Sequence, residues 1–193
     1  MAAVPGSMDL EPGSRTQFWR TVDEWPSTAR PRALWPFIAE AGSLTERLRE
    51  RSGGRFQVQV LAQGHAALHA EDMALLGAKP DEAGYVRQVF LCGDERPWVY
   101  ARSLVAGAAD RWLKELGERP LGDQVFAHAD AKRSTIEAAK LDPRHTLYKE
   151  AVGRLPAAER ARVVDELWAR RSLLTVEGVH ILIYECFLPE MGV

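Results

Sequence analysis

Two charged residues stand where the sequence otherwise predicts apolar strands. Glu185 lies in the run "HILIYECFLP" (180–189), and Arg87 lies in "YVRQVFLC" (85–92). In an extended strand, alternate residues point to the same side, so each charge shares a face with apolar neighbours. Burying an unpaired charge costs several kcal/mol. Each of these two residues therefore needs a partner.

That partner can be internal or external. In a purely structural arrangement, the two charges pair with one another or with Arg102, Arg170 or Arg171 as a buried salt bridge. In a functional arrangement, a small anion completes the pairing. The planar fork of Arg87 then binds a ligand carboxylate, and Glu185 meets the polar far end of the ligand. Sequence alone leaves both arrangements open.

A predicted helix start adds a weaker indication of an anion site. Ser43 followed by Glu46 has capping-box spacing, which predicts Ser43 as the N-cap of a helix running through Arg49. The first N–H groups of a helix favour a carboxylate. Helix starts are common, however, so this feature alone does not establish a site.

Other site chemistries lack their motifs. The chain contains no GxGxxG after a strand, no GxxxxGK[ST], no GxSxG and no HExxH. His65 and His69 are four apart but lack an identifiable third ligand, so we expect neither a metal nor a cofactor. Cys92 and Cys186 lie inside apolar runs, which favours buried free thiols in a reducing compartment over a disulfide.

Size and charge narrow the class of protein. The 193 residues carry 25 Lys and Arg against 27 Asp and Glu, with no basic stripe, so a nucleic-acid partner is not expected. No apolar run approaches the ~20 residues that span a bilayer. Residues 1–17 lack the order of a signal peptide and predict a disordered leader. We expect residues 18–193 to form one domain, acting as a cytoplasmic monomer.

The strands and helices expected from the pattern indicate an α+β fold, an antiparallel β-sheet with helices packed around it. The strand signals are alternating or β-branched runs joined by polar turns, at 56–61, on both sides of the turn 93–97, and within 170–189 around Glu177-Gly178. The helix signals occupy 33–49 as a helix-turn-helix, 107–117, and most of 128–168, interrupted by Pro143 and Pro156.

Taken in order, several segments resemble one known family. They cover most of residues 33–189: "GSLTERL" (42–48), "FQVQVL" (56–61), "VRQVFLCGDERPWVYARSLV" (86–105), "LKELGERPLGDQVF" (113–126), "WARRSLL" (168–174) and "LIYECFLP" (182–189). Each segment is weak by itself, but the ordered set is similar to the chorismate pyruvate-lyases. Members of that family make 4-hydroxybenzoate and pyruvate from chorismate for ubiquinone synthesis.

The resemblance implies an internal ligand pocket sealed under two helical flaps. It also implies roles for four residues. Arg87 would hold the ring carboxylate, and Glu185 would lie near the ring hydroxyl as a catalytic group. Leu44 and Leu121 would each contribute a backbone amide from a flap. Family members often have methionine where this chain has Leu44, a change that a backbone contact tolerates.

Two alternatives remain beside this hypothesis. The first is a non-catalytic module that binds a small aromatic acid, built on the fold of certain regulator effector domains. Residues 1–33 are too short for the DNA-binding domain that a regulator needs, which favours the enzyme. The second is a lyase that gives 3-hydroxybenzoate.

Overall fold

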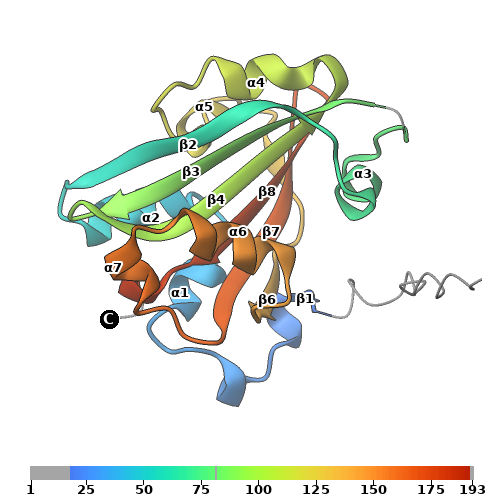
Figure 1. The fold of residues 1–193 in the computed structure, drawn as a ribbon. Helices are drawn as coiled ribbons and strands as arrows, with labels where there is room; N and C mark the ends of the chain where they lie inside the picture. The colour runs from blue at the N-terminus through green and yellow to red at the C-terminus, as the bar shows by residue number, and fades with distance from the viewer. Residues whose placement is uncertain (1–17, 81, 192–193) are drawn as a thin grey trace, which may run out of the picture.

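A computed structural model describes residues 18–80 and 82–191 (Figure 1). The leader predicted for residues 1–17 lies outside this range. An eight-stranded antiparallel sheet forms the centre, in the order β1-β6-β7-β8-β4-β3-β2, and β5 also pairs with β7. Its strands are β1 (Arg20–Thr21), β2 (Phe56–Ala66), β3 (Gly84–Gly93), β4 (Arg96–Ala106), β5 (Lys132–Arg133), β6 (Glu137–Leu141), β7 (Leu167–Val176) and β8 (Val179–Phe187).

Short helices surround the sheet. The α-helices are α1 (Trp35–Ile38), α2 (Leu44–Arg51), α3 (Ala70–Leu76), α4 (Arg111–Lys114), α5 (Leu121–Val125), α6 (Thr146–Arg154) and α7 (Ala157–Arg160). Single 3₁₀ turns lie at Val22–Glu24, Ser27–Ala29, Gly107–Asp110 and Pro189–Met191. The mixed architecture with an antiparallel sheet confirms the predicted α+β class. No helix in the described ranges is long and apolar enough to cross a bilayer.

Both predicted hairpins form, and each has a two-residue turn with left-handed backbone. Asp94 and Glu95 link β3 to β4 with φ of 52° and 64°, and Glu177 and Gly178 link β7 to β8 with φ of 49° and 74°. Such turns match the natural twist of paired strands, so they fix the register of each hairpin. The predicted helix start is also confirmed, because the Ser43 side chain accepts a hydrogen bond from the Glu46 N–H at 3.2 Å.

The prediction for residues 128–168 was wrong in its first part. The segment that contains β5 and β6 is extended, and helix appears only in α6 and α7. The β6 sequence, Glu-Ala-Ala-Lys-Leu, consists of good helix formers. Its pairing with β7 on one side and β1 on the other overrides that local preference.

The register divides the sheet into two faces that carry different arginines. Residues directly opposite in neighbouring strands share a face. We call one side the Arg87 face, because Arg87 lies opposite Ser103, which lies opposite Ile183. We call the other the Arg102 face, because Arg102 lies opposite Tyr184, which lies opposite Arg171.

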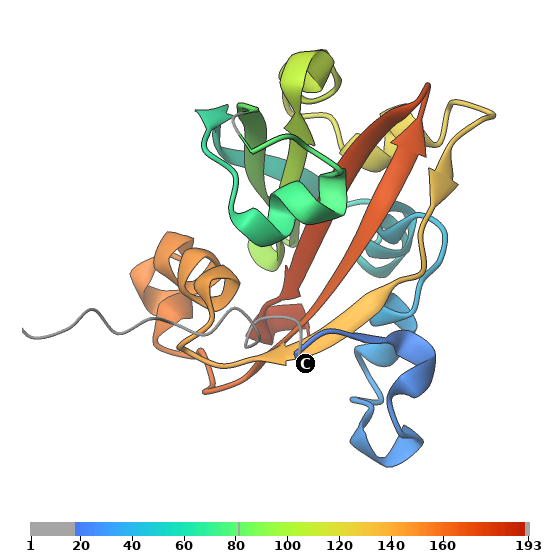
Figure 2. The same ribbon diagram turned by 90° about the vertical axis from the view of Figure 1, so that its right-hand side faces the viewer.

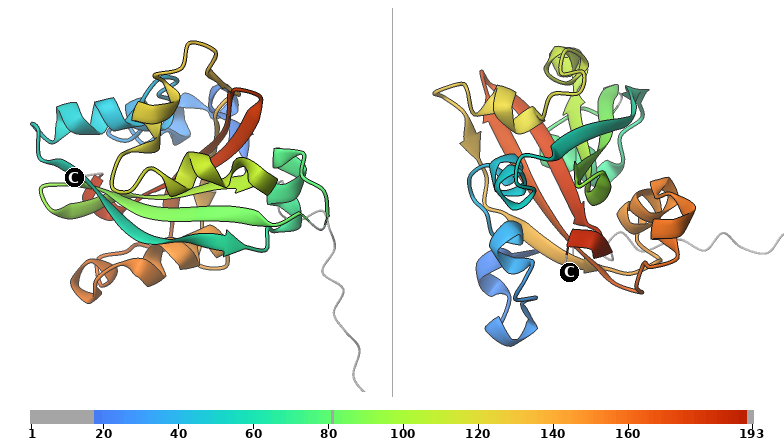
Figure 3. Two further views of the ribbon diagram at one scale, coloured as in Figure 1. Left: turned by 90° about the horizontal axis from the view of Figure 1, so that it is seen from above. Right: turned by 90° about the vertical axis from the view of Figure 1, so that its left-hand side faces the viewer.

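Different helices cover the two faces. Seen from above, α2, α4 and α5 lie on one side of the sheet and α6 and α7 on the other (Figure 3, left). Seen from the side, α3 lies nearer the viewer than the β7–β8 hairpin, and α2 lies beyond it (Figure 2). The Arg102 face packs against α3 and α6 through one apolar cluster that includes Leu76, Leu147 and Ala151. The Arg87 face packs against α1, α2, α4 and α5 through two clusters.

Candidate functional site

A polar strip crosses the Arg87 face between its two apolar clusters. One cluster packs under α1 and α2 and includes Leu44 and Leu48, and the other packs under α4 and α5 and includes Leu121 and Val125. The strip consists of buried or half-buried polar side chains from five strands: Arg87, Ser103, Arg133, Arg170, Ser172 and Glu185. Small-ligand sites are usually lined by apolar side chains with a few polar groups among them, and this part of the face has such a composition.

Arg87 is buried, at 2% exposure, and has no acidic partner among the residues that the structure describes. One guanidinium nitrogen, Nη2, donates to the carbonyl oxygens of Gly117 and Arg119 at 2.8 and 3.1 Å. Its Nε is buried without a hydrogen-bond partner, and within the described ranges no carboxylate forms an ion pair with it. Burial lowers the pKa of Arg87 to about 10, which still leaves the side chain charged at neutral pH. The site therefore holds a buried cation that lacks an anion.

Glu185 is paired, and its partner is Arg170. Arg170 Nε donates to Glu185 Oε2 at 2.5 Å, and the two side chains are 1% and 11% exposed. Arg170 Nη1 also donates to the carbonyl oxygens of Phe37 and Glu40 at 3.0 and 2.8 Å, while Nη2 is buried without a partner. Of the two arrangements considered from the sequence, the buried salt bridge is therefore the one found for Glu185. It does not account for Arg87.

Arg87 and Glu185 share one face without touching. Arg87 lies opposite Ser103, and Glu185 lies opposite Ala101, two residues away on the same strand. Two strand spacings and two residues of offset put their Cα atoms roughly 12 Å apart. Among the strand residues that the structure describes, Glu185 is the one acidic side chain on the Arg87 face.

The strand register also shows which of Arg102, Arg170 and Arg171, the three arginines considered as partners of the strand charges, lies on the Arg87 face. Arg170 lies opposite Glu185 and belongs to the polar strip. Arg102 and Arg171 lie on the other face, where both form ion pairs with carboxylates, so neither can reach a ligand held by Arg87. Alternation along a strand decides this, since Arg170 and Arg171 are neighbours in sequence and point to opposite sides.

Leu44 and Leu121 occupy equivalent positions in the two helices that cover the strip. Each is the first residue of its helix, α2 or α5, and each side chain is buried. The two helix starts lie close together: a Cβ atom added at Gly122 would lie 3.4 Å from the Thr45 hydroxyl. Because the first N–H groups of a helix have no intrahelical acceptor, both starts present donors in the same region.

The cover helices are joined by an exposed ion pair. The Arg49 guanidinium on α2 donates to both carboxylate oxygens of Asp123 on α5, at 2.9 and 2.6 Å. Both side chains are about two-fifths exposed, at 42% and 40%. The pair lies on the outer surface of the cover, so it closes the two helices over the strip without entering it.

Arg133 belongs to the strip and was missed by the sequence analysis. It lies opposite Leu174 on β7, donates from Nη1 to Ser172 Oγ at 2.5 Å and from Nη2 to the Gly42 carbonyl at 3.3 Å, and has a buried Nε without a partner. Burial, followed by the positive charge of Arg170, lowers the pKa of Arg133 to about 10. Its segment was predicted as helix, and a two-residue strand has no sequence signal of its own.

The described residues offer neither a metal site nor a disulfide. They contain no group of three His, Cys, Asp or Glu side chains close enough to hold a metal ion. Cys92 and Cys186 are free and buried, as predicted. The chemistry available on the polar strip is therefore that of guanidinium, carboxylate and hydroxyl groups. Such a donor set binds and orients an organic anion.

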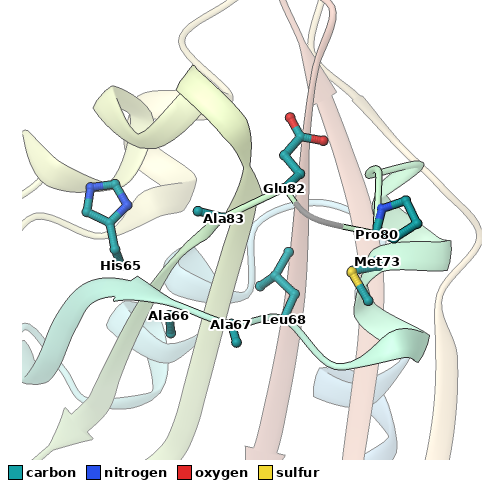
Figure 4. Close-up of a pocket in the computed structure, with 8 residues that line it drawn as sticks. All are labelled: His65, Ala66, Ala67, Leu68, Met73, Pro80, Glu82 and Ala83. Carbon is teal, nitrogen blue, oxygen red and sulfur yellow. The ribbon is translucent and has the colours of Figure 1, made fainter.

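Two open hollows lie away from the polar strip. The first, about 480 Å³, lies between the end of β2 and α3 (Figure 4). Its lining is mostly apolar and has no arginine: His65, Ala66, Ala67, Leu68, Met73, Pro80, Glu82 and Ala83. The second, about 470 Å³, is lined by three β2 residues and Glu118. Neither contains Arg87 or Glu185, so the internal pocket under the cover helices stays a prediction.

The comparison with known proteins decides the family. A sequence model of the family described as chorismate lyase matches residues 15–191. The chain belongs to the chorismate lyase family. The resemblance found in the ordered sequence segments is thereby confirmed.

Several relatives carry the same printed name, "Probable chorismate pyruvate-lyase". One from Aromatoleum aromaticum is 39% identical over 191 residues, covering 95% of this chain and 97% of the relative. One from Thiobacillus denitrificans is 38% identical, covering 83% of this chain and 85% of the relative. The likeness thus extends over nearly the whole length of both proteins.

Solved structures with the same fold come from transcription regulators. The effector domain of PhnF from Mycobacterium smegmatis matches with a TM-score of 0.52 at 13% identity, covering 78% of this chain and 91% of that domain. The effector-binding domain of the Bacillus subtilis trehalose repressor matches with a TM-score of 0.51 at 12% identity, covering 69% and 91%. At this identity the likeness shows the fold alone.

Proposed function

We propose that this protein converts chorismate to 4-hydroxybenzoate and pyruvate, the first step of ubiquinone ring synthesis. The observation that carries the proposal is Arg87, a buried arginine that pairs with no carboxylate of the described residues, in a chain of the chorismate lyase family. Keeping such a charge without its anion is costly, and a ligand carboxylate offsets that cost.

The reaction suits the groups on the polar strip. The C3–O ether bond of chorismate breaks, the enolpyruvyl group leaves as pyruvate, and C4 loses its proton as the ring becomes aromatic. The hydroxyl at C4 stays on the ring. No electron is gained or lost overall, so the site must orient the dianion, stabilise the departing group and accept a proton.

The residues divide these tasks by position. Arg87 binds the ring carboxylate through a charge-assisted pair, and the first backbone amides of α2 and α5, at Leu44 and Leu121, line the same enclosure. Glu185, held in place by Arg170 at 2.5 Å, meets the C4 end of the ring. As the one carboxylate on this face among the described strand residues, it is our candidate for the group that accepts the C4 proton.

The decisive experiment mixes purified protein with chorismate and separates the products by chromatography. We expect 4-hydroxybenzoate and pyruvate in equal amounts, and Glu185→Gln should slow their release well over tenfold, about 1.4 kcal/mol or more of barrier. Release of 3-hydroxybenzoate would identify the alternative lyase. No turnover, with 4-hydroxybenzoate still raising the melting temperature, would favour the non-catalytic module whose fold the regulator domains share.

The setting of the reaction is part of the same proposal. We place it in the cytoplasm, because the two buried free cysteines suit a reducing compartment. We expect the active species to be a monomer, which sedimentation equilibrium with and without ligand measures.

A further inference from the structure

We infer that Arg133, together with Arg170 and Ser172, receives the second carboxylate of the substrate, the one on the enolpyruvyl group. This inference rests on the proposed function and extends it to Arg133 and Ser172, two residues that the sequence analysis did not single out. It starts from two donors that the protein leaves unused. Arg133 Nε and Arg170 Nη2 are both buried, and neither has a hydrogen-bond partner.

These two donors belong to one cluster. Arg133 Nη1 donates to the hydroxyl of Ser172, which is two residues from Arg170 on the same face of β7. The charges of Arg170 and Glu185 both act on Arg133. Glu40 also acts on it, but the Glu40 carboxylate is paired with Arg47 at 3.2 Å. Within the described part of the chain, the cluster therefore has unused hydrogen-bond donors and one strand-borne carboxylate, Glu185, which is already paired with Arg170.

The charge balance of the polar strip matches a dianion. Among the strand residues that the structure describes on this face, Arg87, Arg133 and Arg170 carry three positive charges and Glu185 carries the one negative charge, which leaves two positive charges uncompensated. A monocarboxylate such as 4-hydroxybenzoate neutralises one of them. Chorismate, with a carboxylate at each end, neutralises both. A second guanidinium far from Arg87 is the expected device for distinguishing substrate from product.

The positions of the two arginines fit a ligand with carboxylates at both ends. Arg87 on β3 and Arg133 on β5 are separated by four strand spacings, roughly 20 Å between Cα atoms along the sheet. The Arg133 side chain reaches over β7, the next strand toward Arg87, where its Nη1 donates to the Ser172 hydroxyl. Glu185 lies on β8, the middle one of the three strands between them.

A positioning role must be separated from a charge-pairing role, because Arg133 also anchors the chain before α2. Its Nη2 donates to the Gly42 carbonyl, next to the N-cap Ser43. Loss of that anchor alone would loosen the cover helices and weaken the binding of every ligand equally. Loss of a charge partner would weaken the binding of the dianion chorismate more than the binding of the monoanion 4-hydroxybenzoate. The two roles therefore predict different ratios of substrate to product affinity.

The experiment compares Arg133→Gln, Arg133→Lys and Lys132→Gln with the wild type. Lys132 is the exposed neighbour on the same strand, so Lys132→Gln removes the same charge without touching the strip. We expect Arg133→Gln to raise the KM for chorismate at least tenfold while the Kd for 4-hydroxybenzoate, from titration calorimetry, changes less than threefold. Arg133→Lys should recover part of the loss, and Lys132→Gln should behave as wild type. Far-ultraviolet circular dichroism and thermal melts confirm that each variant is folded.

Two results would overturn the inference. If Arg133→Gln weakened the binding of chorismate and of 4-hydroxybenzoate equally, Arg133 would be only an anchor of the cover helices. If the variant left the KM for chorismate unchanged, Arg133 would not belong to the site. Either result leaves the proposed function standing, because the wild type still releases pyruvate. A wild type that never releases pyruvate from chorismate would defeat the function and this inference together.

Discussion

The two faces of the sheet both bury arginines, but they balance the charges differently. On the Arg102 face, Arg171 donates to Glu137 and Glu71 at 2.7 and 2.6 Å. Arg102 donates to Asp72 at 3.2 Å, and its Nε lies 3.7 Å from a carboxylate oxygen of Glu150, an ion-pair distance too long for a hydrogen bond. On the Arg87 face, the described strands carry Arg87, Arg133 and Arg170 but one carboxylate, Glu185, which pairs with Arg170.

The electrostatic consequence is visible in two buried arginines on different strands of the same sheet, Arg171 on β7 and Arg87 on β3. Burial acts to lower the pKa of Arg171, but its hydrogen bonds with Glu137 and Glu71 outweigh burial and raise the pKa. Burial lowers the pKa of Arg87 to about 10, and no carboxylate opposes it. We interpret the paired arginines of the Arg102 face as structural, and the buried Arg87 without a carboxylate as a candidate ligand-binding group.

The largest expected effect is on the stability of the Arg102 face. Asp72 is buried, accepts from Arg102 at 3.2 Å and from the Tyr184 hydroxyl at 2.7 Å, and holds α3 to the sheet. Asp72→Asn leaves Arg102 without its closest charge partner, so we expect the free energy of unfolding to fall by about 3–5 kcal/mol. Urea denaturation measures this. At a low temperature where the variant stays folded, its turnover of chorismate should equal that of the wild type. A loss of turnover without a loss of stability would show that the Arg102 face takes part in the reaction.

The opposite result is expected for a variant on the Arg87 face, which should lose activity and keep its stability. Arg87→Met removes the ring-carboxylate partner, so we expect kcat/KM for chorismate to fall about a hundredfold, or about 2.7 kcal/mol. The substitution also removes the cost of burying a cation that has no acidic partner in the described structure. The free energy of unfolding should therefore stay within about 1 kcal/mol of the wild type. Kinetics and urea denaturation on one preparation give both numbers. A variant as unstable as Asp72→Asn would show that Arg87 is structural.

Thiol reactivity reports on the Arg102 face independently of the ligand. Cys92 and Cys186 both belong to the apolar cluster on that face, and burial raises the pKa values of their thiols to about 11 and about 12. Since only the thiolate reacts, labelling at pH 8 should be about a hundredfold slower than for an ordinary thiol, and should rise with pH toward 11. Asp72→Asn should accelerate labelling and Arg87→Met should not. Fast labelling of the native wild type would contradict the packing of this face.

The smallest effect belongs to the outer surface of the cover. The Arg49–Asp123 pair joins α2 to α5 in an exposed position, and such pairs contribute at most about 1 kcal/mol. Asp123→Asn should therefore speed the release of 4-hydroxybenzoate by no more than about fivefold, as measured by stopped-flow displacement. An acceleration of fifty-fold would mean that this pair, rather than the arginines of the strip, retains the ligand.

Much of the fold and half of the site could be predicted from the sequence. The charges of Arg87 and Glu185 were conspicuous because each interrupts a strongly apolar strand, and both hairpins had clear turn signals. The partner of Glu185 could not be chosen, because Arg170 and Arg171 are adjacent and only the register of β7 against β8 shows which one faces it.

Arg133 could not be found at all from sequence. It lies in a two-residue strand followed by a run of good helix formers, so local preference indicates helix where pairing with β7 imposes extended chain. Strand pairing over about forty residues of sequence is a tertiary interaction, and it leaves no periodic pattern in so short a segment. The residue with the most specific proposed role is thus the one least visible in the sequence.

A crystal structure with 4-hydroxybenzoate tests the central claim most directly. The ligand should lie on the Arg87 face beneath α2 and α5, with its carboxylate within hydrogen-bond distance of the Arg87 guanidinium and its hydroxyl toward Glu185. Binding in the hollow between β2 and α3 (Figure 4), with Arg87 still donating only to the Gly117 and Arg119 carbonyls, would contradict the account.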